Sequence, residues 1–221
     1  MHYNNITRAK FKSRPNRFIA IVEVMGKELS VHVKNTGRCR ELLIPGCTVY
    51  LEKADNPERK TPYDLVAVEK GGKIINIDSQ APNKVVKEWL VGLSMFDVVK
   101  PEYTYGNSRI DFYMEKDNEK YLMEVKGCTL FREGTGFFPD APTERGAKHL
   151  VELTGAIKEG YRACIAFVIQ GEGIDEVKPN ADTDADFTAK YYEAINAGVK
   201  VLFLKCRVTE STLEIINEDF S

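Results

Sequence analysis

Two short segments of this chain carry residue types that could hold a divalent metal ion. Asp111 lies in the first segment, and Glu124 and Lys126 lie in the second. Two carboxylates, the carbonyl group of Val125 and water would make an open site suited to Mg²⁺ or Mn²⁺. A lysine beside such a metal can orient a water molecule or stabilise a developing negative charge. The residue types therefore predict metal-dependent chemistry at this place.

The elements that must position these residues are two strands. Segments 109–114 and 121–126 alternate apolar and polar residues, as half-buried strands do, and residues 117–118 suit a tight turn between them. Closing that hairpin places Asp111 directly opposite Glu124. Like charges so placed destabilise a sheet unless a cation lies between them or one carboxyl keeps its proton. The same spacing also fits an exposed hairpin whose charges neutralise one another, so the spacing alone leaves both interpretations open.

The composition narrows the class of protein. The chain has 221 residues, a net charge of −2, three histidines and five scattered cysteines without a C-x-x-C pair. Neither a zinc site nor a disulfide framework is expected, and a reducing cytoplasm is the simplest location. No apolar run approaches the length of a membrane span, and no secretory signal pattern is present, so we expect no association with a membrane.

Positive charge is concentrated near the amino terminus. Before the first acidic residue, Glu23, stand five cations, namely Arg8, Lys10, Lys12, Arg14 and Arg17. With Phe11 and Phe18 between them, they suit an arm that grips a phosphate backbone, although a solvated terminal segment fits equally well. Residues 35–40 form a turn-like segment with two cations, which predicts either a phosphate-holding turn or a plain connecting loop.

The first eighty residues are predicted to form a small β-barrel. Short apolar runs separated by turn residues predict five strands, at 18–25, 29–33, 47–51, 63–68 and 73–77. A barrel of the oligonucleotide-binding type is one fold of this size. The pattern changes near residues 80–83, so we expect two domains, 1–81 and 82–221.

The second domain is predicted to be a mixed sheet flanked by helices. Asn83 is expected to cap a first helix that stops near Gly92, and Thr143 is expected to cap a second that ends at Gly160. Segment 127–140 includes Gly134 and Gly136 and is expected to be mobile. The remaining expected elements are a helix at 186–196, buried strands at 162–170 and 199–206, and a short edge strand at 213–216. The fold class is therefore mixed α/β (α+β), with helices on both faces of the sheet.

This order of elements resembles the nuclease superfamily that carries the PD-(D/E)xK motif. Asp111 matches the first acid of that motif, and Glu124 and Lys126 match its second half. Glu88, on the preceding helix, stands where many members have an additional acidic ligand. One departure is Ile110, which stands where the motif has proline, a position that varies across the superfamily.

The whole chain resembles the sugar fermentation stimulation protein family. The matching segments are Asn35-Thr36-Gly37, residues 105–112, Glu124-Val125-Lys126 and residues 138–146. The resemblance covers nearly the full length and implies an oligonucleotide-binding-like barrel joined to a nuclease-like domain. It also implies DNA binding without sequence preference and a regulatory role in sugar use. Residues 38–40 depart from relatives, which often have small or apolar residues there.

Two hypotheses of different classes follow. In the first, the chain is a Mg²⁺- or Mn²⁺-dependent nuclease: Asp111, Glu124, the Val125 carbonyl and Glu88 bind the metal, and Lys126 assists the chemistry. The expected contacts to nucleic acid are Arg14, Arg17, Arg38, Arg109, Arg145 and Lys148. In the second, the chain is a non-catalytic DNA-binding regulator of sugar metabolism genes with a vestigial nuclease site. The sequence does not separate DNA from RNA as the substrate, and it leaves the oligomeric state open, a homodimer being one option.

Overall fold

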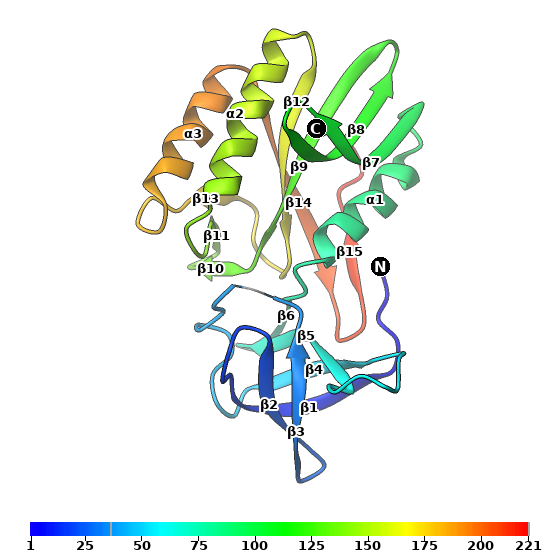
Figure 1. The fold of residues 1–221 in the computed structure, drawn as a ribbon, viewed down its shortest axis with the longest axis vertical. Helices are drawn as coiled ribbons and strands as arrows, with labels where there is room; N and C mark the ends of the chain where they lie inside the picture. The colour runs from blue at the N-terminus through cyan, green and yellow to red at the C-terminus, as the bar shows by residue number, and fades with distance from the viewer. Residues whose placement is uncertain (36, 221) are drawn as a thin grey trace.

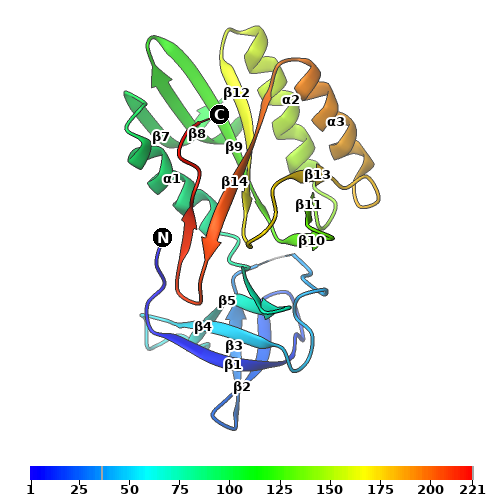
Figure 2. The same cartoon turned by 180° about the vertical axis from the view of Figure 1, so that it is seen from behind.

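The computed structural model describes residues 1–35 and 37–220 and shows a β-barrel at one end and a larger α/β unit at the other (Figure 1). Thr36 of the Asn35-Thr36-Gly37 segment lies outside the described residues. The view from behind shows the first residues of the chain leaving the barrel and running beside the edge of the larger unit (Figure 2). The predicted fold class, an oligonucleotide-binding-like barrel followed by a mixed sheet with helices, is confirmed.

The barrel closes through a parallel contact between two of its strands. The strands are β1 (Ile6–Ser13), β2 (Ile19–Val24), β3 (Lys27–Val33), β4 (Thr48–Lys53), β5 (Tyr63–Lys70) and β6 (Lys73–Asn76). Their order is β3-β2-β1-β4-β5-β6, and an additional pairing joins β3 to β5. Within the described residues this makes a closed barrel of β1 to β5, with β6 paired to β5 outside the closure. Closure removes the free sheet edges of these strands.

The expected basic arm at the amino terminus is wrong, because most of it is strand β1. Phe11 is 2% exposed and packs inside the barrel, so it is no stacking surface for a base. Ala9 points inward beside it, and Lys10 and Lys12 point outward. Lys12 is paired with Glu23 of β2 at 2.5 Å. The alternation of inward apolar and outward charged residues is the signal of a strand, which the concentration of charge concealed.

The larger unit is a mixed sheet with helices on both faces. In order, its elements are α1 (Ala81–Leu93), β7 (Val98–Tyr105), β8 (Ser108–Lys116), β9 (Glu119–Cys128), β10 (Leu130–Arg132), β11 (Thr135–Phe138), α2 (Glu144–Lys158), β12 (Arg162–Ile169), β13 (Val177–Pro179), α3 (Ala185–Asn196), β14 (Lys200–Val208) and β15 (Leu213–Ile215). The sheet order is β15-β14-β12-β9-β8-β7, in which β9, β12 and β14 are parallel. Helix α1 packs on one face of this sheet, against β9 and β15. Helices α2 and α3 pack on the other face (Figure 1).

The helix ends test the predicted caps. The side chain of Thr143 accepts a hydrogen bond from the Gly146 amide, so the predicted cap of α2 is confirmed. Asn83 is not a cap, because α1 begins at Ala81 and places Asn83 in its first turn. Segment 127–140, expected to be mobile, contains the paired strands β10 and β11.

Among the described residues, no helix combines the length and the apolar composition that crossing a bilayer requires.

A buried polar network joins the barrel to the larger unit. The side-chain amide of Gln170, after β12, donates hydrogen bonds to Oδ1 of Asn76 at 2.9 Å and to the Asp78 carbonyl at 3.1 Å. Asn76 in turn donates to the hydroxyl of Tyr3 at 2.8 Å. All four residues are at most 3% exposed, so these bonds form where water does not compete. They fix the barrel against the end of the sheet that carries Lys126.

Candidate functional site

The hairpin of β8 and β9 has the predicted register. The paired residues run from the turn to Phe112, which lies opposite Met123. Asp111 and Glu124 are the next residues of their strands, and the pairing of the two backbones stops before them. The ladder therefore ends where the two carboxylates would otherwise face each other.

Asp111 is held by hydrogen bonds to both of its carboxylate oxygens. Oδ1 accepts from the side-chain amide of Asn83 at 2.7 Å, and Oδ2 accepts from the backbone amide of Val125 at 2.8 Å. The Val125 side chain points into the core on the α1 side. Burial and the nearby charge of Glu124 raise the pKa of Asp111 above its ordinary value. Asp111 is thus fixed in place by two hydrogen bonds. A cation beside it would offset the repulsion from Glu124.

Glu124 is buried, with 2% of its surface exposed. Its Oε1 accepts hydrogen bonds from the ammonium group of Lys126 at 2.6 Å and from Nδ1 of His149. Burial alone would raise the pKa of Glu124, but the His149 hydrogen bond and the Lys126 charge lower it below its ordinary value. The carboxyl therefore stays ionised inside the protein. The spacing left open an exposed hairpin whose charges neutralise one another. Glu124 is too deeply buried for that interpretation.

His149 was not predicted as a site residue. It lies on α2, 3% exposed, because this part of the helix packs on β9. Nε of Arg145 lies 3.4 Å from its Nε2. A guanidinium group only donates, so Nε2 is the acceptor and the proton of the neutral ring sits on Nδ1, facing Glu124. The sequence placed His149 on the charged face of α2, and its spacing from Glu124 gave no signal for a contact.

The donor set fits a hard divalent cation. Oε2 of Glu124 is buried and has no hydrogen-bond partner among the described residues, which leaves a carboxylate oxygen free to bind a metal. Asp111 supplies a second carboxylate. It lies close enough to Glu124 that the charge of Glu124 raises the pKa of Asp111. No group of three or more His, Cys, Asp or Glu side chains suited to a metal occurs within residues 1–35 and 37–220. Such a site would therefore be completed by backbone oxygen or water.

Glu88 is not part of this set. Its carboxylate lies 2.7 Å from the terminal ammonium group of Met1, and its side chain is 60% exposed. The expected role of Glu88 as a third ligand is corrected, because α1 presents Asn83 to Asp111 and presents Glu88 to the amino terminus.

The basic residues expected beside the site do come together. Arg109, Arg145 and Lys148 line one open hollow of about 390 Å³, and His149 lines it too. Arg109 is paired with Glu102 at 2.6 Å, and Lys148 lies 3.4 Å from the carbonyl of Asn107. Because His149 also contacts Glu124, this hollow adjoins the carboxylate site. Three positive side chains therefore line the hollow next to the candidate metal site, and two of them, Arg109 and Lys148, also pair with carboxylates.

A second basic hollow, of about 380 Å³, lies on the barrel and is lined by Arg14, Arg17, Arg38 and Arg40, among others. The guanidinium group of Arg14 is committed to the protein itself. It donates to the carbonyls of Asn35, Gly37, Arg38 and Arg17 at 2.6 to 2.8 Å. The expected contact between Arg14 and nucleic acid is therefore corrected to a structural role, and Arg17 and Arg38 remain as the exposed cations of the predicted set.

Two of the segments singled out in the sequence meet between the barrel and the larger unit. A Cβ atom at Gly37 would lie 2.5 Å from Oδ2 of Asp140, so only glycine allows this approach. Burial raises the pKa of Asp140, while the charges of Arg14 and Arg38 oppose the rise. The loop before α2 therefore lies against the basic barrel loop.

Comparisons with known proteins agree with this architecture. The family model described as the sugar fermentation stimulation protein RE domain matches residues 80–212, and the SfsA N-terminal OB domain matches residues 13–77. Homologues named sugar fermentation stimulation protein are 53% identical in Desulfitobacterium hafniense and 52% identical in Clostridium beijerinckii. Each match covers 97% of this chain and at least 95% of the homologue.

A solved structure is similar over the same length. The structure of Pyrococcus furiosus SfsA in complex with Ca²⁺ is 28% identical, with a TM-score of 0.84, and the match covers 97% of this chain and 96% of that one. The two family models match in the expected order along the chain. The relatives named above are more than 50% identical to it. This chain belongs to the sugar fermentation stimulation protein family.

Proposed function

We propose that this protein binds DNA without sequence preference and hydrolyses its phosphodiester bonds with Mg²⁺ or Mn²⁺. The observation that carries the proposal is Oε2 of Glu124, a buried carboxylate oxygen without a partner among the described residues. It stands near a half-buried second carboxylate, Asp111 of the neighbouring strand, and beside Lys126 of its own strand. An ionised oxygen buried without a donor is costly, and a bound cation removes that cost.

The proposed chemistry divides among a few side chains. A bound divalent ion would polarise the phosphodiester and lower the pKa of a water molecule. Asp111 and Glu124 would hold the ion through carboxylate oxygens, with the Val125 carbonyl as a further ligand. Lys126 would stabilise the negative charge that develops on the phosphate group. His149 keeps Glu124 ionised and oriented.

Nucleic acid would be held through its phosphates. The hollow of Arg109, Arg145 and Lys148 adjoins the carboxylate site, and the barrel hollow offers Arg17 and Arg38. Contacts of this kind carry no base information, which supports binding without sequence preference. The homologous structure holds Ca²⁺, a cation that also prefers oxygen ligands, and this supports a divalent metal in the family.

The experiment is a cleavage assay with single- and double-stranded DNA and RNA, in Mg²⁺, in Mn²⁺ and in EDTA. We expect metal-dependent cleavage of DNA by the unaltered protein and none by Asp111→Asn, while DNA affinity is kept. Asp55→Asn, an exposed aspartate in a barrel loop, is the matched control and should cut normally. Binding without cleavage of any of the four substrates would reject the nuclease and favour the non-catalytic regulator.

Two further expectations belong to the same proposal. We keep the domain boundary between residues 81 and 82 as part of the proposal, close to Ala81, where α1 begins after the last barrel strand. All five cysteines are free thiols, which supports a reducing compartment such as the cytoplasm.

A further inference from the structure

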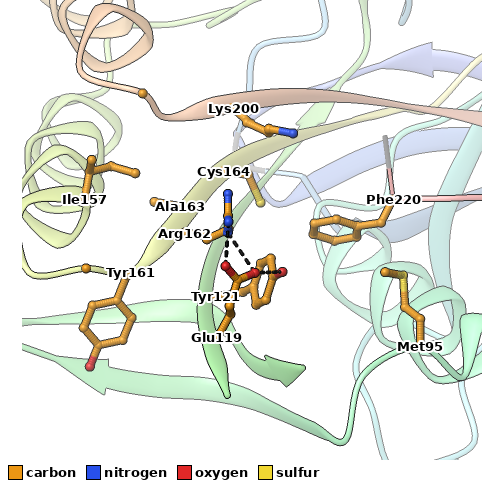
Figure 3. A pocket seen from close by; sticks show the side chains of 12 residues that line it. Met95, Glu119, Tyr121, Ile157, Tyr161, Arg162, Ala163, Cys164, Lys200 and Phe220 are labelled. Carbon is orange, nitrogen blue, oxygen red and sulfur yellow. Dashed lines mark hydrogen bonds and ion pairs between the residues drawn. The ribbon is translucent and has the colours of Figure 1, made fainter. Parts of the chain in front are cut away.

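A second pocket, unrelated to the carboxylate site, opens at the far end of the large sheet. It has a volume of about 510 Å³ and lies where the parallel strands β9, β12 and β14 begin (Figure 3). The carboxylate site lies further along β9, at Glu124 and Lys126, in the direction of the barrel. A volume in this range is typical of pockets that bind small molecules.

The walls of the pocket are apolar and aromatic. Figure 3 shows Phe220 and Met95 on one side, Tyr161 and Ile157 on the other, and Tyr121 between them. Tyr121 and Phe220 make an edge-on ring contact with centroids 6.2 Å apart. These walls suit a ligand with an apolar body, such as an aromatic ring or a branched alkyl chain.

The charges that line the pocket are unequal. Arg162 and Glu119 neutralise each other through two hydrogen bonds, of 2.5 and 2.9 Å. Lys200 lies on the neighbouring strand and adds a second positive charge, so two cations and one anion give the lining a net charge of +1. A ligand that complements this pocket therefore carries a negative charge next to its apolar body.

The floor of the pocket does not favour covalent chemistry. Cys164 is 4% exposed, and burial raises the pKa of its thiol to about 12, against a smaller opposing effect of Lys200. A thiol that stays protonated is a poor nucleophile. The pocket is thus suited to reversible binding.

We propose that this pocket binds a small organic carboxylate with an apolar body, its carboxylate meeting Lys200 and its body lying against the rings of Tyr121 and Phe220. This site is independent of the nuclease proposed above, and the Asp111→Asn variant should bind the ligand normally.

The test uses 4-phenylbutyrate as the probe, with its neutral amide as the matched compound, and follows backbone amide signals by NMR. We expect saturable shifts at Tyr121, Ala163 and Gly198. The amide, or the Lys200→Met variant with 4-phenylbutyrate, should bind at least about tenfold more weakly, as the loss of a charge-assisted hydrogen bond implies. Lys60→Met, an exposed lysine of the barrel, is the control and should bind normally.

Phe220→Ala provides a second, independent variant, because it removes one apolar wall without changing the charge. It should also weaken binding of 4-phenylbutyrate. Shifts that do not saturate, or equal binding by the unaltered protein and both the Lys200→Met and Phe220→Ala variants, would overturn the proposal.

Discussion

His149 donates a hydrogen bond from Nδ1 to Oε1 of Glu124, and both side chains are buried, with 3% and 2% of their surfaces exposed. The contact joins α2 to β9 and helps to lower the pKa of the carboxyl. It explains how Glu124 remains ionised without access to water. It also links the carboxylate site to Arg145, which lines the adjacent basic hollow.

Replacement of His149 by alanine should destabilise the fold. The change leaves Glu124 with one donor fewer inside the protein, and an unsatisfied buried partner of this kind costs about 1–3 kcal/mol. Urea unfolding at pH 7 measures the difference. His149→Asn should recover part of the loss, because its amide can donate from a position near Nδ1, whereas the control His2→Asn should change little. Equal stability of His149→Ala and the unaltered protein would contradict the structural role of this contact.

The barrel should lose stability at acid pH through Asp64. Burial would raise the pKa of Asp64, but hydrogen bonds from Arg59 and His32 and the charge of Lys34 lower it below its ordinary value of 3.8. A lowered pKa in the folded state means that the stabilisation is present above the ordinary value. It is lost as the pH falls through the folded-state pKa.

Asp64→Asn should therefore be less stable at pH 7 by about 1–3 kcal/mol, since it removes the buried carboxylate that pairs with the half-buried Arg59 and Lys34. The difference should shrink once the pH falls below the ordinary pKa. Urea unfolding at pH 7 and pH 3 measures it, with Asp55→Asn as the exposed control. A difference that stays constant or grows toward pH 3 would be inconsistent with the ion pairs of Asp64.

Arg17 and Arg38 should contribute affinity for DNA through phosphate groups. Replacing each by alanine should weaken binding to all sequences alike. The slope of log K against log salt should fall by roughly 0.9 for each phosphate contact removed. Fluorescence anisotropy across a range of KCl concentrations measures both quantities. Arg207→Ala, which removes an exposed arginine of β14, is the control. An unchanged slope in the Arg17 and Arg38 variants would move the binding surface away from the barrel hollow.

Arg14 should behave differently from its neighbours. Its guanidinium donates to four backbone carbonyls in two loops of the barrel, so Arg14→Met should destabilise the barrel by about 2 kcal/mol. Thermal or urea unfolding measures the loss. The contrast with Arg17→Ala, which should unfold like the unaltered protein, separates a structural cation from a binding one. Reduced DNA affinity of Arg14→Met without any loss of stability would contradict the assignment.

Much of the fold was predictable because the hydrophobic period is strong. The register of β8 and β9 followed from alternation and a two-residue turn, and it is the observed register as far as Phe112 and Met123. Strand β1 was missed because its outward lysines and arginines resemble a basic arm, although Ala9 and Phe11 point inward. Edge strand β7 was also missed, since half of its residues are exposed, none is buried, and the strand shows little alternation in hydrophobicity.

The candidate site was predictable only within one hairpin. Asp111, Glu124 and Lys126 lie close together in sequence, and strand geometry brings them together. The contacts of Asn83 with Asp111 and of His149 with Glu124 depend on how α1 and α2 pack on the sheet. Spacing along the chain does not contain that information. The same limit explains Glu88, whose helix turns it toward Met1.

The proposed nuclease needs one divalent ion shared by Asp111 and Glu124, and locating Mn²⁺ by anomalous scattering from soaked crystals tests this most directly. We expect one ion bonded to a carboxylate oxygen of each residue in the unaltered protein, and no ion there in Glu124→Gln. Mn²⁺ that binds only elsewhere, or not at all, with the Lys126 ammonium still on Glu124 would contradict the account.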